Sequence, residues 1–385
     1  MPVANFSSEI IYADNAATTK PDAEALALMF ELQKKFFANP SSAYKLSRPL
    51  KKILQDSRER IAACLNAEPH EIFFTSGGTE SDNWAIKSSV LSCLRERPNI
   101  ITSAVEHKAI LNSCAAMENL GCSVTKLPVD KFGAVNPDDL REKILPQTKI
   151  VSVMLANNEV GTIQPVKNLA AVTHEHGKIF HTDAVQAVGH IPVDVAELGV
   201  DMLSASAHKF NGTKGVGFLY VRTGLNLAPY LDGGGQEFSK RAGTENVPVI
   251  AAMAFALEKN CRDMNVTAKK ISACEKILLD RLKTGGIDFI LNGGENRLPG
   301  HLSLSFKDCD GETLLHRLDL KNICVSTGSA CNSQQVQKSH VLQALAVPEN
   351  YIGGTIRITF GKENSRDEAK IIGESLLDIL QKISA

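Results

Sequence analysis

One lysine in this sequence stands where its amine could become reactive. Lys209 ends the run Leu-Ser-Ala-Ser-Ala-His-Lys, so we expect it at the end of a strand. Partial burial lowers the pKa of a lysine, and the neutral amine can then attack an aldehyde. The competitor Lys214 lies between two glycine turns, which favour exposure. An average lysine is a solvated surface charge, so the prediction for Lys209 depends on what surrounds it.

Four polar clusters each follow an apolar run that is typical of a buried strand. They are Ser76–Asp82, Val105–His107, Asn157–Gly161 and His181–Gln186. Each also has an ordinary structural interpretation. In the same order, these are a capped helix, a histidine with its hydrogen bonds made, a turn and an N-cap aspartate. Ligands collect at the carboxyl ends of strands in open parallel sheets. Because all four clusters and Lys209 would share that edge, the sequence predicts one ligand site there.

The clusters suit a ligand that carries a phosphate and an aromatic ring. The paired glycines of Ser76–Asp82 precede a helix, and a helix N-terminus after a glycine turn is a ready phosphate site. Thr79 and Asp82 have the spacing of an N-cap and a capping box. Asp183 at the end of a buried strand needs a partner, which a pyridinium nitrogen would provide. Gln186, one turn later, could reach a ring hydroxyl.

Three further side chains could take part in the chemistry. His107 could stack on an aromatic ring or move protons. Asn158 could hydrogen-bond a ligand hydroxyl. Cys331 stands among small residues, in Thr-Gly-Ser-Ala-Cys-Asn-Ser, which favours an accessible loop where a thiolate can act as nucleophile. Most of the nine cysteines are expected to be small buried hydrophobes.

Strands and helices alternate in the first two thirds of the chain. This alternation predicts an α/β fold with a mostly parallel sheet that is covered on both faces. The expected strands are Glu71–Thr75, Asn99–Val105, Lys149–Leu155, Lys178–Thr182, Asp201–Ser206 and Gly215–Val221, and the expected helices include Ser81–Cys93, Lys108–Asn119 and Val166–His176.

A second domain is expected because a single core stops growing near ~250–300 residues and this chain has 385. Its character changes after about residue 257. We predict a large domain over 16–257 and a smaller α+β domain that combines 1–15 with 258–385. The expected elements of the smaller domain are a charged helix over Val266–Lys283, strands near His301–Phe306 and Thr355–Phe360, and a closing helix from about Ser365.

Composition narrows the function classes. The net charge is -1, which gives no reason to expect nucleic acid or an anionic membrane as a partner. No apolar run approaches the ~20 residues that span a bilayer, and the first residues do not have the pattern of a signal peptide. The odd number of scattered cysteines, without a CxxC pair, argues against a disulfide framework and a zinc site. We expect a cytoplasmic protein without a metal.

The residues in this order resemble the class V aminotransferase family of fold-type I pyridoxal-phosphate enzymes. Within that family they resemble the cysteine desulfurases, and the loop around Cys331 is similar to that of the long-loop branch that serves iron–sulfur cluster assembly. The resemblance covers nearly the whole chain, from Tyr12 to Gly361. Its motifs are TSGGTESDN, VEHKAI, NNEVGTIQP, HTDAVQAVG, SAHKFNGTKGVGFLYVR, RAGTENV and STGSAC.

The resemblance implies pyridoxal 5'-phosphate as cofactor and a role for each matching residue. Lys209 would carry the cofactor as a Schiff base, His107 would stack on its ring and relay protons, and Cys331 would take the sulfur. For the remaining positions it implies Asp183 on the ring nitrogen, Gln186 and Asn158 near the ring hydroxyl, Gly78, Thr79, Ser206 and His208 on the phosphate, Thr244 on the phosphate of the other subunit, and Arg357 on the substrate carboxylate with Asn39 close to it.

The implied reaction converts L-cysteine to L-alanine and leaves a persulfide on Cys331. The sulfur would pass to an acceptor protein such as an iron–sulfur scaffold, or to a thio-modification route, and Cys331 could contact an iron–sulfur cluster in that transfer. The shared phosphate site implies a homodimer. Selenocysteine lyase and another aminotransferase-like activity are the alternatives on the same fold. A non-enzymatic sulfur carrier would need Cys331 but not Lys209, Asp183 and a phosphate loop.

Overall fold

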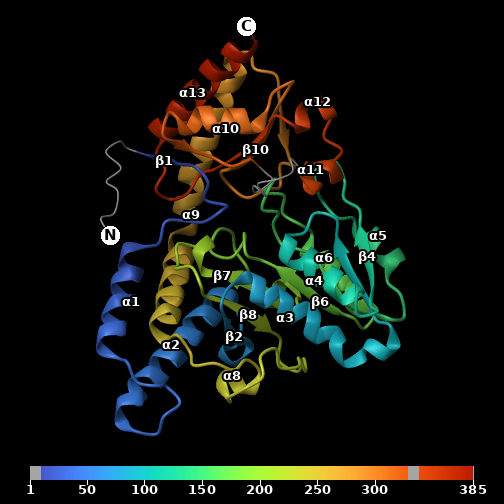
Figure 1. Cartoon of the computed structure of the whole chain (residues 1–385), viewed down its shortest axis with the longest axis vertical. Coiled ribbons are helices and arrows are strands. Elements are labelled where there is room, and N and C mark those ends of the chain that lie inside the picture. The colour runs from blue at the N-terminus through green and yellow to red at the C-terminus, as the bar shows by residue number, and fades with distance from the viewer. Residues whose placement is uncertain (1–9, 328–337, 385) are drawn as a thin grey trace.

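A seven-stranded sheet forms the centre of the larger part of the molecule in the computed structural model, which describes residues 10–327 and 338–384 (Figure 1). Its strand order is β2-β8-β7-β6-β5-β3-β4. All neighbours are parallel except β8, which is antiparallel to both β2 and β7. The predicted fold class is confirmed. The strands are β2 (Ile72–Thr75), β3 (Asn99–Ser103), β4 (Ser123–Leu127), β5 (Thr148–Ser152), β6 (Ile179–Asp183), β7 (Met202–Ser206) and β8 (Gly217–Val221).

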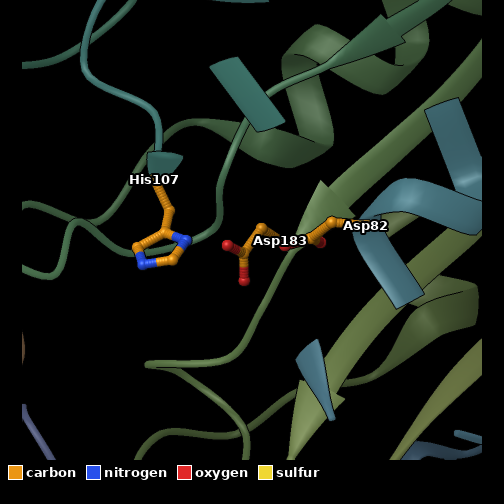
Figure 2. A group of neighbouring side chains, drawn as sticks. All are labelled: Asp82, His107 and Asp183. Atoms are coloured by element: carbon orange, nitrogen blue, oxygen red, sulfur yellow. The ribbon is translucent and has the colours of Figure 1, made fainter. Parts of the chain in front are cut away.

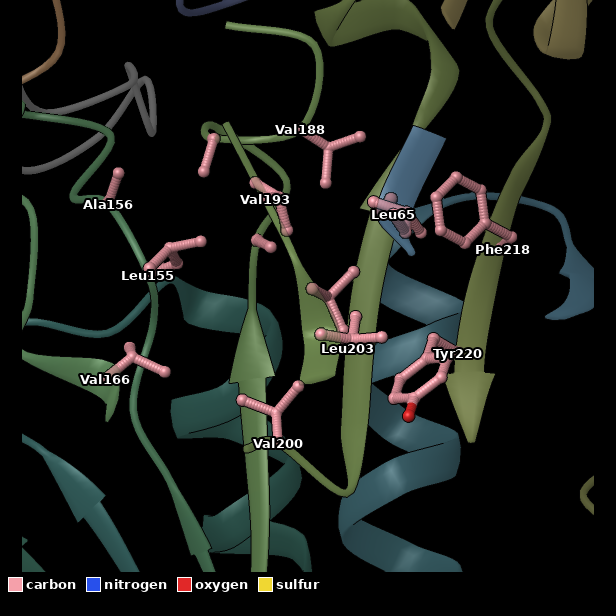
Figure 3. Packing of buried hydrophobic residues seen from close by; sticks show 14 of the residues in the cluster. Leu65, Leu155, Ala156, Val166, Val188, Val193, Val200, Leu203, Phe218 and Tyr220 are labelled. Atoms are coloured by element: carbon pink, nitrogen blue, oxygen red, sulfur yellow. The ribbon is translucent and has the colours of Figure 1, made fainter. Parts of the chain in front are cut away.

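Both faces of this sheet are covered by helices, which explains why its strands are apolar throughout. Ile100 and Met202 pack with α3 (Gly78–Val90) and α4 (Lys108–Glu118) on one face. Their neighbours Ile101 and Leu203 pack on the other face with α2 (Arg48–Leu65) and α6 (Val166–Glu175). Figure 3 shows part of this second core, where Leu65 of α2 lies beside Phe218 and Tyr220 of β8. Buried on both sides, the sheet is a rigid platform for side chains at its edge.

A smaller antiparallel sheet with the order β12-β10-β9 forms the second part of the molecule. Next to it β1 pairs in parallel with β11. One continuous core joins these strands to α10 and α13. The elements are β1 (Ile11–Tyr12), β9 (Phe289–Asn292), β10 (His301–Phe306), α10 (Gly311–Asp319), β11 (Ile323–Cys324), β12 (Thr355–Thr359) and α13 (Arg366–Ser384).

The long helix α9 (Val247–Thr284) connects the two parts and runs past both sheets (Figure 1). Leu257 belongs to the core of the large sheet and Leu278 to the core of the small one. The predicted boundary after residue 257 therefore falls inside a helix, and the charged stretch predicted over Val266–Lys283 is the second half of that helix. The domain limits themselves stay a prediction.

One strand of the large sheet, β4, was not among the six strands expected from the apolar runs. β4 lies at an edge, its residues are mostly half-buried or exposed, and Ser123, Thr125 and Lys126 interrupt its apolar pattern. The remaining helices are α1 (Ala23–Lys35), α5 (Pro137–Lys143), α7 (Val195–Leu198), α8 (Gln236–Ser239), α11 (His340–Ala344) and α12 (Glu349–Ile352). Over the described residues, none of the helices combines the length and apolarity that a bilayer crossing requires.

Candidate active site

The predicted polar clusters meet at the carboxyl edge of the large sheet. Asp183 ends β6, His107 precedes α4, and Asp82 lies in the first turns of α3. Ligand-type atoms of these three side chains all lie within 4.8 Å of one another. Figure 2 shows Asp183 between the imidazole of His107 and Asp82. Three segments that are distant in sequence thus form one site.

Lys209 lies at the same edge, in a short 3-10 turn that follows β7. Its ammonium group donates to the carbonyl oxygens of Ala16 at 2.5 Å and Ala17 at 2.8 Å. Burial lowers the pKa of Lys209 to about 8, and the nearby cation of Arg357 acts in the same direction. Lys214 is exposed. The structure therefore favours Lys209 over Lys214 as the reactive amine.

The segment 14–19 connects Lys209 to the rest of the site. Gln186 Nε2 donates to the Ala16 carbonyl at 2.9 Å, so Gln186 and Lys209 meet on one oxygen atom. Thr19 Oγ1 donates to the His208 carbonyl at 2.9 Å, and Thr18 Oγ1 lies 3.1 Å from His208 Nδ1. These bonds hold the turn that carries Lys209 against a second turn nearly 200 residues away in sequence.

His107 is poised as a neutral imidazole. Its Nδ1 accepts a hydrogen bond of 3.1 Å from the backbone of Ala109, so the proton of the neutral ring belongs on Nε2. Desolvation lowers the pKa of His107, the nearby Asp183 opposes that shift, and Lys209 and Lys108 reinforce it. The His107 side chain is exposed. A neutral ring of this kind can stack on an aromatic ligand and relay a proton.

Asp183 is one of three carboxyl groups buried together. Burial raises its pKa, while the hydrogen bond from the Val185 backbone and the charge of Lys209 oppose that rise. Its Oδ1 accepts from the backbone of Val185 at 2.9 Å. Asp82 and Glu106 lie behind it, and burial beside Asp183 raises the pKa of both.

The carboxyl groups behind Asp183 have incomplete hydrogen bonding. Glu106 Oε1 accepts from Ser103 at 2.6 Å and from the Met154 backbone at 3.0 Å, but its Oε2 has no partner among the described residues. Asp82 Oδ1 is likewise without a hydrogen bond there. Proximity makes it costly to ionise all three groups, so protons are retained on Asp82 and Glu106. Asp183, closest to the cations, is then the group that carries the negative charge.

A histidine inside the sheet completes this polar layer. His181 Nδ1 lies 2.9 Å from Ser152 Oγ, and its Nε2 lies 2.9 Å from Ser204 Oγ. Full burial lowers the pKa of His181 to about 3, so the ring is neutral at neutral pH. No role in the site was predicted for Asp82, Glu106 or His181 from the sequence, where their burial cannot be read.

The start of α3 forms a cradle of backbone amides. The helix begins at Gly78 with Gly77 as its N-cap, so the predicted capping box with Thr79 as N-cap is wrong. A Cβ atom at Gly78 would lie 2.5 Å from Val185 Cγ2, and one at Gly77 would lie 3.5 Å from Ser206 Oγ. Only glycine at position 78 allows the helix N-terminus to approach β6 and β7 this closely. Backbone amides there, with Ser206 nearby, suit a phosphate.

Arg357 joins the site from the small sheet. It is buried, donates from Nη2 to Asp14 at 2.7 Å and from Nη1 to the Asn158 carbonyl at 2.8 Å, and leaves its Nε without a hydrogen bond in the described chain. Its burial shows that it is not an ordinary surface salt bridge. Asp14 was missed at the sequence level, although it lies in the matched segment Tyr12–Thr19. Asp14 is paired with the guanidinium group of Arg357, to which a substrate carboxylate would have to bind.

Of the remaining predicted site residues, two are exposed in the single chain. Asn39 is exposed in the loop between α1 and α2, where its side chain accepts a hydrogen bond from the backbone of Ser41. This loop lies at the end of the molecule opposite the small sheet (Figure 1). The closeness of Asn39 to Arg357 stays a prediction. Thr244 is exposed and lines a cavity of about 220 Å³ beside Ser76. Cys331 lies outside the described residues.

The donor set suits pyridoxal phosphate better than a metal ion. The three side chains of Figure 2 could hold an ion by distance alone. However, burial keeps Asp82 protonated, and the adjacent Lys209 adds a positive charge, both of which weaken cation binding. An amide cradle for a phosphate, a buried Asp183 for a ring nitrogen and an amine with a lowered pKa match the three functional ends of the cofactor.

Comparisons with known proteins agree with this geometry. Residues 11–372 match the family described as Aminotransferase class-V. A protein named cysteine desulfurase IscS from Methanosarcina thermophila is 43% identical, with 98% of this chain and 94% of that protein covered. A solved structure named NifS-like protein has a TM-score of 0.91 at 36% identity, covering 97% of this chain and 100% of that chain. Another, SspA in complex with cysteine, has a TM-score of 0.83 at 34% identity, covering 91% and 99%.

The titration of Lys209 is the first test of this electrostatic description. In the cofactor-free protein, competitive acetylation followed by mass spectrometry should give Lys209 a pKa near 8, against ~10.4 for an ordinary lysine. Arg357→Gln should raise the pKa of Lys209 above the parental value because a neighbouring cation is removed. Asp14→Asn should lower it below the parental value because a neighbouring anion is removed. Lys214 serves as the internal control. An ordinary value for Lys209, or no response to Arg357→Gln, would contradict the description.

Glu106 makes folding stability depend on pH. Its folded pKa of about 8 lies above the ordinary ~4.3, so between these values the folded protein keeps a proton that the unfolded chain has lost. Stability then falls as pH rises, with a limiting slope of about 1.4 kcal/mol per pH unit. In urea titrations of the cofactor-free protein, Glu106→Gln should reduce the loss of stability between about pH 5 and pH 8. The exposed Glu118→Gln, at the end of α4, should not change it, and equal pH profiles for all three proteins would refute a protonated Glu106.

Proposed function

This chain belongs to the Aminotransferase class-V family, and on that premise we propose that it is a pyridoxal-phosphate-dependent cysteine desulfurase. It converts L-cysteine to L-alanine and transfers the sulfur onward. The observation that carries the proposal is the amine of Lys209, held at the carboxyl edge of a buried sheet between Asp183 and a buried arginine. A sulfur carrier without a cofactor would have no use for this arrangement.

Each end of the cofactor has a holder among the residues of this chain. When bound, pyridoxal phosphate supplies an aldehyde that condenses with amines and a protonated ring that withdraws electrons from the substrate α-carbon. Lys209 would bind the aldehyde carbon and Asp183 the ring nitrogen. Gln186 and Asn158 would serve the ring hydroxyl. The phosphate would be held at Gly78, Thr79, Ser206 and His208.

Arg357 would bind the carboxylate of L-cysteine in a bidentate fork. In the structure this guanidinium is paired with Asp14 at 2.7 Å. The substrate carboxylate would therefore replace one anionic partner with another, and the buried arginine would not be left without a countercharge. The same positive charge contributes to the lowered pKa of Lys209, so substrate recognition and the reactivity of the amine are electrostatically connected.

Proton transfer would be carried out by Lys209 and His107. The neutral amine of Lys209 is a base of suitable pKa for the α-proton of a substrate held by Arg357. His107, with its proton on Nε2, can donate to or receive from the same region. The Cys331 thiolate would attack the substrate sulfur. The carbon–sulfur bond breaks, its electron pair stays on carbon and takes a proton, and the products are L-alanine and a Cys331 persulfide.

We further propose that two copies of the chain share their active sites and hand the sulfur to a separate acceptor protein, such as an iron–sulfur scaffold, in the cytoplasm. Thr244 would reach the phosphate bound by the partner subunit. Its exposure in a single chain leaves the side chain available to a partner subunit, which supports this role. Asn39, likewise exposed, would also be available to a partner.

Cys331→Ser should separate cofactor binding from sulfur chemistry. The variant should still bind pyridoxal phosphate with the spectrum of the parent protein, since no cofactor holder has changed, but should form neither L-alanine nor a persulfide. Absorbance, amino-acid analysis and mass spectrometry on one sample measure all three. Cys309→Ser, a half-buried thiol in the small domain, is the matched control. Alanine and sulfide release at the parental rate would rule out the role of Cys331.

Thr244→Ala should weaken cofactor binding by about tenfold or more, the value of a hydrogen bond to a charged group. Equilibrium dialysis gives the affinity, and light scattering should give a dimer of about 83 kDa, twice 41.6 kDa, for parent and variant alike. Thr284→Ala, at the exposed end of α9, is the control. A monomer with full cofactor affinity would contradict the shared site.

A further inference from the structure

Two cysteines outside the active site face each other across a helix interface. Cys64 lies near the end of α2 and Cys261 in the first half of α9. Both are half-buried and pack against the core of the large sheet. The two thiols are joined by a side-chain hydrogen bond. None of the other cysteines in the described chain has a thiol as hydrogen-bond partner, so this pair is a distinct feature.

A second contact fixes the register of the two helices at this point. Arg60 Nη1 lies 3.7 Å from Glu258 Oε2. Cys64 follows Arg60 by four residues and Cys261 follows Glu258 by three, spacings that place residues on the same helix face one turn further on. The ion pair and the thiol pair are therefore successive contacts of one interface, and the closeness of the sulfurs follows from the packing of two long helices.

The two thiols differ in reactivity. Cys261 has a lowered pKa because Cys64 donates its S–H to it, and the pKa of Cys64 is raised by the same bond and by burial. The thiolate is the attacking species in thiol–disulfide exchange. Cys261 is thus suited to react first, with Cys64 beside it to complete the exchange.

We propose that Cys64 and Cys261 form a dithiol modification site that a low-molecular-weight disulfide closes to an intramolecular disulfide. The Cys261 thiolate attacks one sulfur of the reagent, forms a mixed disulfide and releases one thiolate. Cys64 loses its proton and attacks the Cys261 sulfur, which releases the second thiolate. Two protein thiols are oxidised and one disulfide is reduced to two thiols. This site is independent of the proposed function, since neither cysteine touches a residue assigned to the cofactor or substrate.

The bridge would connect α2 to α9 across nearly 200 residues of sequence. Closing so long a loop reduces the freedom of the unfolded chain, which stabilises the folded one if the bond forms without strain. Closing the bridge requires the two sulfurs to approach to the S–S bond length of ~2.05 Å. Oxidation would thus fasten α2 to the helix that connects the two sheets.

The test uses full-length, cofactor-loaded protein and cystine, the disulfide of L-cysteine, as the probe. After exposure, non-reducing peptide mapping should find Cys64 joined to Cys261 with the loss of two hydrogens, and the melting temperature should rise. Mapping distinguishes this bond from any reaction at Cys331. Cys64→Ser should stop at the mixed disulfide, with one cysteinyl group on Cys261 and no rise in melting temperature.

A second single variant and a control variant show whether the bridge depends on these two cysteines. Cys261→Ser should leave Cys64 largely unmodified, and Cys309→Ser should form the bridge as the parent does. Three results would each overturn the proposal: a stable mixed disulfide on Cys261 of the parent, a bridge to another cysteine, or modification of Cys261 no faster than that of the half-buried Cys93.

Discussion

The rest of the structure depends on one constraint: the amine of Lys209 is largely removed from water and lies near both positive and negative charges. Lys209 is withdrawn from water at the carboxyl edge of the sheet, and its ammonium group is held by the carbonyls of Ala16 and Ala17. Asp183 and Asp14 favour its charged form, while burial and Arg357 favour the neutral one, and the balance puts its pKa at about 8. A lysine without this setting would stay protonated and would be a poor nucleophile at neutral pH.

The fold provides this setting through rigidity and through the joining of distant segments. The large sheet is covered on both faces, so strand ends such as Asp183 and Ser206 have little freedom to move. The small sheet contributes Arg357, and the segment 14–19 passes between the two sheets with contacts to both. The buried pair Asp82 and Glu106 retains protons and leaves the negative charge on Asp183, where a ring nitrogen would need it.

Much of this arrangement could be predicted from the sequence, for a physical reason. A parallel sheet buried on both faces produces unbroken apolar runs, and each run ends where polar residues gather, so Lys209, Asp183 and His107 could be placed at one edge. The edge strand β4, half-exposed and interrupted by polar residues, has no such signal. Asp14, Asp82 and Glu106 could not be recognised because their roles come from burial and from partners far away in sequence. The position of Asn39 depends on a loop whose direction no local pattern specifies.

The most direct test of the account is the site of covalent cofactor attachment. Cofactor-free protein is incubated with pyridoxal phosphate near neutral pH, reduced with borohydride and mapped by mass spectrometry. The account predicts one phosphopyridoxyl group per chain, on Lys209, and its loss in Lys209→Ala while Lys214→Ala retains it. Attachment to Lys214, scattered attachment to surface lysines, or no attachment to the parent protein would contradict the central claim that the setting of Lys209 makes its amine reactive.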